Sequence, residues 1–163
     1  QEGRTPEESL AIIRSTTRDN SRTPMQWTDE KFAGFSSHEP WLVVNPNKEV
    51  INVEAQEKEP NSLLSFYKQM IQLRKQHTAL ITGEFKEYLP EHKQLFIYER
   101  IESSEQFLIM VNLTMEKTTF DLTTEKLAED WSLVLTNYLD EPQFGLVGEF
   151  APYEAKMYQR KVL

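Results

Sequence analysis

The clearest periodic pattern in the sequence predicts a helix over residues 61–77. Apolar residues recur there at spacings of three and four, from Leu63 to Leu73. Lysine, arginine and glutamine fill the opposite side, and basic residues gather in the last turn, where they favour the helix dipole. Asn61 or Ser62 can cap the first turn. We expect this helix to pack its apolar stripe on a large neighbour.

A shorter helix is predicted over residues 7–15, where Leu10 and Ile13 lie at helical spacing behind acidic residues. Pro6 suits the start of such a helix because the first helical position needs no N–H donor. Residues 16–41, by contrast, show no sustained period and are interrupted by proline and glycine. We expect a loop there, with at most one short strand. Long irregular segments in compact proteins are usually functional.

After residue 82 the pattern changes to short runs rich in β-branched and aromatic residues. A succession of strands without intervening helices indicates an antiparallel sheet or a small sandwich rather than βαβ units. We place a domain boundary near residues 81–84. The predicted strands lie within residues 85–89, 95–101, 106–114, 117–123, 131–139 and 153–163.

Composition fits a folded domain and excludes some partners. The chain has 163 residues, of which 39% are hydrophobic, enough to form a core. It carries 18 basic against 26 acidic residues, a net charge of −8, which repels phosphate backbones, so we expect no nucleic-acid partner. No apolar run approaches the roughly 20 residues that span a membrane. The charged run at 54–60 is predicted to be a solvated loop.

Metal and thiol chemistry have no support in the sequence. There is no cysteine, which excludes disulfides and thiol catalysis and is compatible with a reducing compartment. With no signal segment at its start, the chain is expected to be cytoplasmic. His38, His77 and His92 show no metal-ligand spacing. We expect neither a metal ion nor a cofactor.

The densest candidate chemistry lies in residues 18–27, RDNSRTPMQW. Arg18 and Arg22 supply rigid bidentate donors, and Trp27 supplies a flat apolar face. Sugar hydroxyls and pyranose rings require these two kinds of contact. An arginine–aspartate ion pair that only anchors a loop would use the same residues, so their chemistry alone leaves both interpretations open.

This segment is followed by AGFSSHEPW at 33–41, VNPN at 44–47 and INVEAQ at 51–56. In this order the segments closely resemble the C-terminal part of the oligo-1,6-glucosidase group of glycoside hydrolase family 13. That group includes oligo-1,6-glucosidases, dextran glucosidases, trehalose-6-phosphate hydrolases and sucrose isomerases. The resemblance covers nearly the whole chain, because the helix at 61–80 resembles the last barrel helix and the β-rich remainder resembles the C-terminal domain.

The resemblance implies an α+β fold in two parts. Residues 1–82 would be the C-terminal end of the catalytic barrel, its last βα unit, with the last strand at 22–27, an active-site loop at 28–60 and the last helix at 61–80. Residues 83–163 would form an antiparallel Greek-key β-sandwich. Because a complete (β/α)₈ barrel takes about 250 residues, we expect a fragment whose partner is the missing N-terminal portion of the barrel.

The activity implied by the resemblance is that of a retaining α-glucosidase. In the family an aspartate nucleophile, a glutamate acid/base and a second aspartate act on the sugar. These carboxylates lie upstream of the matching region, so no catalytic residue is assigned and the isolated chain is expected to be inactive. Arg18 and Arg22 carry over as substrate-binding residues that line the glucose pocket. The implied substrate is a short α-glucoside oligosaccharide, with α-1,6 linkage favoured; the sequence fixes neither the linkage nor hydrolase against isomerase.

Side chains near the arginines are expected to have supporting roles. In family members the first arginine pairs with an aspartate from an early barrel loop, which this chain lacks. Asp19, Asn20 and Gln26 are expected to buttress the loop rather than touch substrate. Trp27 and Trp41 are expected to be packing aromatics rather than platforms for sugar rings.

Two other classes of function stay open. A free-standing carbohydrate-binding module would bind glucan through aromatic residues of the β-rich part, although strand alternation places several of them in a core. An interaction module would self-associate through barrel surfaces left exposed. Gel filtration would reveal self-association, and a glucan-dependent change in Trp131 fluorescence would reveal sugar binding. The candidate aromatic residues are Tyr88, Phe96, Tyr98, Trp131 and Tyr138.

Overall fold

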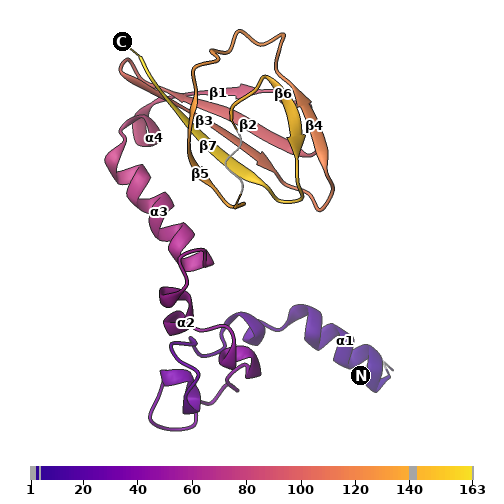
Figure 1. Ribbon diagram of the computed structural model, residues 1–163. Helices are drawn as coiled ribbons and strands as arrows, with labels where there is room; N and C mark the ends of the chain where they lie inside the picture. The colour runs from indigo at the N-terminus through magenta and orange to yellow at the C-terminus, as the bar shows by residue number, and fades with distance from the viewer. Residues whose placement is uncertain (1–2, 4, 140–142, 163) are drawn as a thin grey trace. The chain divides into compact units, whose positions relative to one another are not determined.

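The computed structural model of the protein describes residues 3, 5–139 and 143–162. Contacts within the chain gather in two compact units, residues 1–65 and 66–163 (Figure 1). No helix among the described residues is long and apolar enough to span a bilayer. The first unit contains helices α1 (Pro6–Thr16) and α2 (Val53–Lys58), the 3₁₀ turns η1 (Asp19–Ser21), η2 (Lys31–Gly34) and η3 (Pro46–Glu49), and the start of α3 (Leu63–Gln76).

Helix α1 confirms the helix predicted over residues 7–15, and its first turn explains where it begins. The Thr5 hydroxyl accepts a hydrogen bond from the Glu8 N–H at 3.2 Å, and the Glu8 carboxylate accepts one from the Thr5 N–H at 2.8 Å. This reciprocal capping box satisfies two N–H groups that a helix start leaves without partners. None of the α1 residues is buried, so local capping, not packing, defines this helix.

In the first unit the loop predicted for the charged run is wrong, whereas the barrel strand at 22–27 stays a prediction for a chain that contains the rest of the barrel. No strand forms at 22–27, because a strand needs a neighbouring strand to pair with, and the backbone there bonds to turns instead. Trp27 N–H, for example, donates to the Ala33 carbonyl at 2.9 Å. The charged run predicted as a loop contains α2, whose first turn is capped by the Asn52 side chain accepting from the Ala55 N–H at 2.8 Å.

Helix α3 confirms the helix predicted over residues 61–77. Ser62 caps it, its hydroxyl accepting from the Ser65 N–H at 3.1 Å. None of the α3 residues is buried, and Leu63 is 67% exposed. The large neighbour expected for its apolar stripe is therefore absent from the described part of the chain. A short helix, α4 (Ala79–Thr82), follows α3 and leads into the β-rich part.

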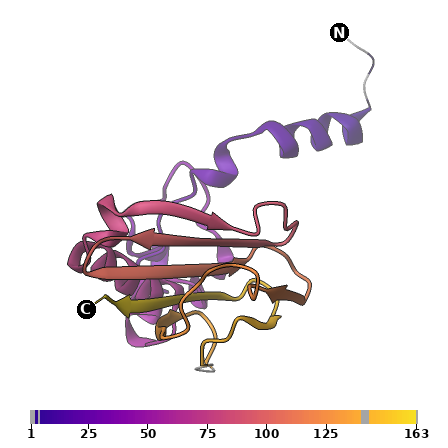
Figure 2. The ribbon, with the colours of Figure 1, turned by 90° about the horizontal axis from the view of Figure 1, so that it is seen from above.

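The β-rich part forms two antiparallel sheets (Figures 1 and 2). All of the strands predicted from the sequence are present, and the antiparallel character is confirmed; the Greek-key sandwich stays a prediction. A further strand, β6, was not predicted because two glycines, Gly145 and Gly148, weaken its pattern. The larger sheet has the order β1 (Glu84–Tyr88), β2 (Leu95–Ile101), β3 (Glu105–Asn112), β7 (Ala155–Lys161), β5 (Ser132–Thr136), and the smaller sheet pairs β4 (Thr118–Asp121) with β6 (Val147–Phe150).

The larger sheet is apolar on both faces. Phe107 and Leu108, neighbours on β3, point to opposite faces as the strand period requires, and both are fully buried. Leu108 belongs to a cluster that also contains Phe120 and Phe150 of the smaller sheet. Phe107 belongs to a second cluster, with Leu80 of α4. The sheet thus has a core on each side.

Polar contacts fasten α4 to the second of these faces. His77 Nδ1 lies 2.7 Å from a Glu105 carboxylate oxygen, and the same carboxylate accepts from Gln159 Nε2 at 3.2 Å. Arg100 donates to the carbonyls of Ala79 and Ile81, at 3.3 and 3.1 Å. The division of the chain into two compact units falls inside α3, between residues 65 and 66, whereas the domain boundary between residues 82 and 83 stays a prediction.

Candidate functional site

The predicted substrate-binding arginines flank the 3₁₀ turn η1. The Ser21 hydroxyl donates to the Arg18 carbonyl at 2.8 Å, and the Arg22 N–H donates to the Asp19 carbonyl at 3.0 Å. Both arginine side chains are exposed. Neither guanidinium makes a hydrogen bond or ion pair with the described residues, so the donors of both groups are available to a ligand.

Backbone hydrogen bonds tie the end of this segment to two of the other segments that carry the family resemblance. Trp27 N–H donates to the Ala33 carbonyl at 2.9 Å, while the carbonyls of Gln26 and Trp27 accept from the N–H groups of Val53 and Glu54, each at 3.0 Å. The segments at 18–27, 33–41 and 51–56, far apart in sequence, therefore meet at Gln26 and Trp27. The Gln26 side chain adds a bond by donating to the carbonyl of residue 51.

A left-handed turn forms part of this meeting point. Phe32, Ala33 and Gly34 have φ values of 55°, 56° and 64°, a region that costs energy for residues other than glycine. Ala33 is fully buried, and its carbonyl accepts from both Trp27 and Thr28. A Cβ atom at residue 34 would lie 3.0 Å from the Thr28 hydroxyl. Strain held by several hydrogen bonds is a feature of functional loops.

The expected supporting roles have mixed outcomes. Gln26 does buttress the loop, through its bond to residue 51. Asp19 contributes through its carbonyl, and the Asn20 side chain lies outside the described residues. The expectation that Trp27 and Trp41 pack in a core is wrong for this chain, because they are 49% and 83% exposed.

The titratable residues in the described part of the chain form no candidate metal centre. No group of three or more histidine, cysteine, aspartate or glutamate residues among the described residues could hold a metal ion. Perturbed titrations have structural causes: burial raises the pKa of Tyr98, and burial with the neighbouring Glu99 carboxylate raises the pKa of Tyr88. The exposed guanidinium groups are donors suited to recognition of a ligand.

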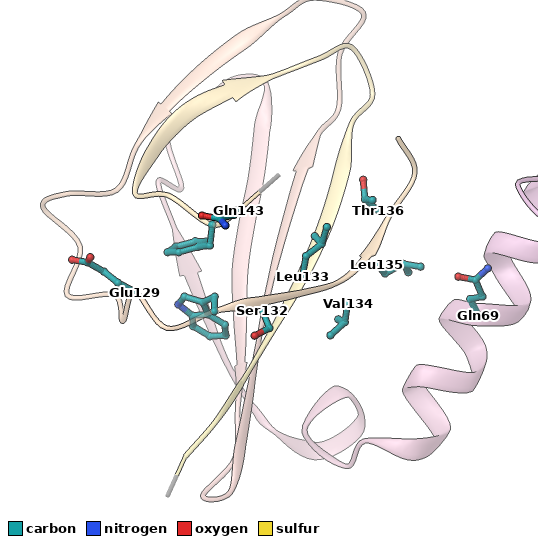
Figure 3. A pocket seen from close by; sticks show the side chains of 10 residues that line it. Gln69, Glu129, Ser132, Leu133, Val134, Leu135, Thr136 and Gln143 are labelled. Atoms are coloured by element: carbon teal, nitrogen blue, oxygen red, sulfur yellow. The ribbon is translucent and has the colours of Figure 1, made fainter. Parts of the chain in front are cut away.

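Sequence reasoning missed a groove along β5 in the second unit. It is lined by residues from α3, β5 and the segments on either side of β5, and its volume is about 550 Å³ (Figure 3). No motif marks it, because most of its members are ordinary strand and loop residues between 129 and 144, and Gln69 lies far from them in the sequence. Of the aromatic residues considered for sugar binding, Tyr88 and Trp131 are buried, as strand alternation predicted for several of them.

Comparison with known proteins identifies the family. The family model for the α-amylase catalytic domain matches residues 1–83 of this chain. The chain therefore belongs to the α-amylase family, glycoside hydrolase family 13, and the resemblance inferred from residues 18–56 is confirmed.

Individual relatives narrow the group. The chain is 40% identical over 162 residues to a probable oligo-1,6-glucosidase 2 of Bacillus subtilis, an alignment that covers 97% of this chain and 28% of that protein. It is 35% identical over 160 residues to the trehalose-6-phosphate hydrolase of Escherichia coli, covering 98% and 29%. The chain thus spans less than a third of the length of these relatives.

Solved structures agree with this grouping. The crystal structure of Bacillus licheniformis trehalose-6-phosphate hydrolase superimposes with a TM-score of 0.87 at 31% identity, covering 97% of this chain and 29% of that one. Isomaltulose synthase from Klebsiella sp. LX3 superimposes with a TM-score of 0.83 at 33% identity, covering 96% and 28%.

Proposed function

We propose that the chain is the C-terminal part of a retaining α-glucosidase that hydrolyses short α-glucosides, with α-1,6-linked glucosides as the favoured substrates. The observation that carries this proposal is the 40% identity to an oligo-1,6-glucosidase across 97% of the chain. In this proposal residues 1–82 are the last βα unit of a (β/α)₈ barrel and residues 83–163 its Greek-key β-sandwich. The parent enzyme is cytoplasmic, and its catalytic carboxylates lie in the missing N-terminal portion of the barrel.

Arg18 and Arg22 are proposed to bind the glucose unit of the substrate. Their guanidinium groups are exposed and have no partners in the described part of the chain. They can therefore donate to sugar hydroxyls and, in the parent enzyme, to the aspartate of an early barrel loop. The backbone hydrogen bonds at Gln26 and Trp27 support this role, because they fix the end of the segment that carries both arginines. Holding donors in place before the substrate arrives lowers the entropic cost of binding.

A chimeric enzyme tests the proposal. The last part of the Bacillus subtilis relative, aligned to this chain, is replaced by these 163 residues, and hydrolysis of p-nitrophenyl α-glucoside is measured. We expect the chimera to be active and the isolated chain to be inactive. Arg18→Ala or Arg22→Ala should lower kcat/KM about 10- to 100-fold, because each removes charged hydrogen bonds to the substrate.

Arg14→Ala is the matched control, since Arg14 is an exposed arginine of α1 in the same segment. It should leave kcat/KM unchanged. Equal losses in all three variants, or none in Arg18→Ala and Arg22→Ala, would contradict the proposed role. Turnover by the isolated chain that Arg18→Ala abolishes would mean that its catalytic groups lie within these residues.

Self-association is a second candidate activity of the isolated chain. It is supported by large apolar side chains of the first unit that are left in solvent, above all Trp41 and Val43, which are 83% and 82% exposed. Uncovered apolar surface of this kind favours association. Gel filtration measures it directly, and a monomer at every concentration would exclude it.

A further inference from the structure

The groove along β5 lies entirely within residues 66–163. Its volume of about 550 Å³ falls in the range of roughly 300–1,000 Å³ that small-molecule sites occupy. In Figure 3 the side chains of Glu129 and Gln69 mark opposite ends of the groove, with Ser132 and Gln143 between them. It is therefore a long, open site rather than a closed cavity.

Four polar side chains of the groove are uncommitted, whereas a fifth, the Thr136 hydroxyl, accepts from the Tyr138 N–H at 3.2 Å. Gln69, Glu129, Ser132 and Gln143 make no side-chain hydrogen bond with other described residues, whereas most polar side chains of the second unit, such as Asn112, do. Two amides and a hydroxyl, each able to donate and to accept, and one accepting carboxylate line the groove. A ligand that carries many hydroxyl groups can use both kinds of group.

Aromatic rings lie beside these polar groups. Trp131 and Phe144 have ring centroids 6.2 Å apart, and both line the groove. The indole N–H of Trp131 donates to the Ala128 carbonyl at 2.7 Å, so the polar end of the ring is already satisfied. Trp131 is buried, so the ring open to a ligand is that of Phe144, which is half-buried and offers apolar contact suited to the C–H groups of a pyranose ring.

The charge of the groove selects against anionic ligands. Glu129 is the only charged residue among the described residues that line it. The nearby Arg160 is paired with the Asp130 carboxylate, at 2.5 Å. Its positive charge is therefore already balanced and does not offset the charge of an anionic ligand. The Glu129 carboxylate would repel the phosphate of a phosphorylated sugar, with no cation to compensate. A neutral sugar would meet no such repulsion.

The shape of β5 disfavours a peptide strand as the occupant. β5 is an edge strand, paired only with β7, and its register is interrupted between Leu133 and Leu135. Such an irregularity breaks the even row of backbone groups that an added strand requires. The groove therefore favours a ligand that binds through side chains.

We propose that the β5 groove binds a neutral oligosaccharide, at a site separate in sequence from Arg18 and Arg22. The choice of an α-glucan chain as that oligosaccharide rests on the proposed function, whereas the preference for a neutral sugar rests on the groove alone.

The test is an NMR titration of the ¹⁵N-labelled 163-residue chain with maltotriose. We expect saturable shifts of the side-chain amide signals of Gln69 and Gln143 and of the backbone amides of β5. Glucose 6-phosphate should produce none. Absence of saturable shifts with maltotriose, or saturation by an extended peptide in its place, would overturn the proposal. Equal affinity for cellotriose would overturn the α-glucan assignment.

Variants separate binding from changes in the fold. Gln69→Ala combined with Ser132→Ala should weaken maltotriose binding about tenfold, because two hydrogen bonds are lost. Gln72→Ala, on the same helix but outside the groove, is the matched control and should change affinity less than about twofold. A control variant that weakens binding as much as the double variant would contradict the site. The titration needs no hydrolysis, so its failure is distinct from failure of the proposed glucosidase function.

Discussion

The two units of the chain are held together in different ways. Residues 66–163 contain two hydrophobic clusters, one on each face of the larger sheet. Among the described residues of the first unit only Pro24, Ala33, Asn52 and Ser62 are buried. That unit is shaped by capping side chains, 3₁₀ turns and the backbone hydrogen bonds of Trp27. Apolar burial is the main source of folding free energy, so only the second unit carries its own stability.

This difference matters for function because the candidate glucose-binding arginines lie in the unit with little core. Local hydrogen bonds set the backbone around η1 and Trp27, but each contributes only about 1 kcal/mol. In the proposed parent enzyme the remaining barrel would cover the exposed apolar side chains of the first unit. The arginine segment would then depend on elements outside this chain, and the β unit would not.

The largest expected effect comes from shortening the chain at two places. A chain of residues 62–163 retains α3, α4 and both clusters, and should unfold cooperatively with nearly the same midpoint as the full chain. A chain of residues 82–163 loses Leu80 from the second cluster and the His77–Glu105 contact. Its free energy of unfolding should fall by about 5 kcal/mol, measured by urea denaturation. Equal stability of the two shortened chains would refute the role given to α3 and α4.

A smaller effect is expected from single substitutions in the two units. Phe107→Ala should lower the free energy of unfolding of the second unit by about 4 kcal/mol, because a fully buried ring is replaced by a cavity. Trp41→Ala, which removes a side chain that is 83% exposed, should change it by less than about 0.5 kcal/mol. A comparable loss in both variants, measured by thermal unfolding, would show that the first unit contributes packing to the second.

The smallest effect concerns alkaline pH. Burial, aided by the Glu154 carboxylate, raises the pKa of Tyr158 to about 12. Unfolded tyrosine ionises near pH 10, so between about pH 10 and 12 the folded state holds this proton more tightly. The stabilisation is complete below pH 10 and is lost as the pH rises towards 12.

Tyr158→Phe removes this dependence. Between pH 9 and 12 the wild-type chain should lose about 2 kcal/mol more of its free energy of unfolding than the variant does. Urea titrations at each pH measure the difference, and Tyr88, also buried and with a raised pKa, is common to both proteins. Parallel pH profiles would mean that Tyr158 ionises in the folded state as it does in the unfolded chain.

The fold was predictable from the sequence where local pattern and tertiary contacts agree. The stripe from Leu63 to Leu73 gave α3, and alternating apolar residues gave the strands of the larger sheet. The prediction failed where partners decide the outcome. The family resemblance assigned a strand to residues 22–27, which have no strand to pair with in the described part of the chain, and β6 pairs with β4 despite Gly145 and Gly148.

The candidate site was predictable only in part. The family segments located Arg18 and Arg22, but local spacing did not reveal that Gln26 and Trp27 join three distant segments. The aromatic character of Trp41 suggested packing, yet the described residues leave it 83% exposed. No local signal could mark the β5 groove, because Gln69 and Gln143 come together only through the fold.

Hydrogen exchange on the intact 163-residue chain, followed by mass spectrometry, tests the contrast between the units most directly. The amides of β2, β3 and β7 should exchange slowly, at rates set by global unfolding of their core, and those of residues 17–60 should exchange much faster through local opening. Equal protection of the two regions would contradict the account, since it would mean that the arginine segment is held as firmly by this chain alone as the β-sheet is.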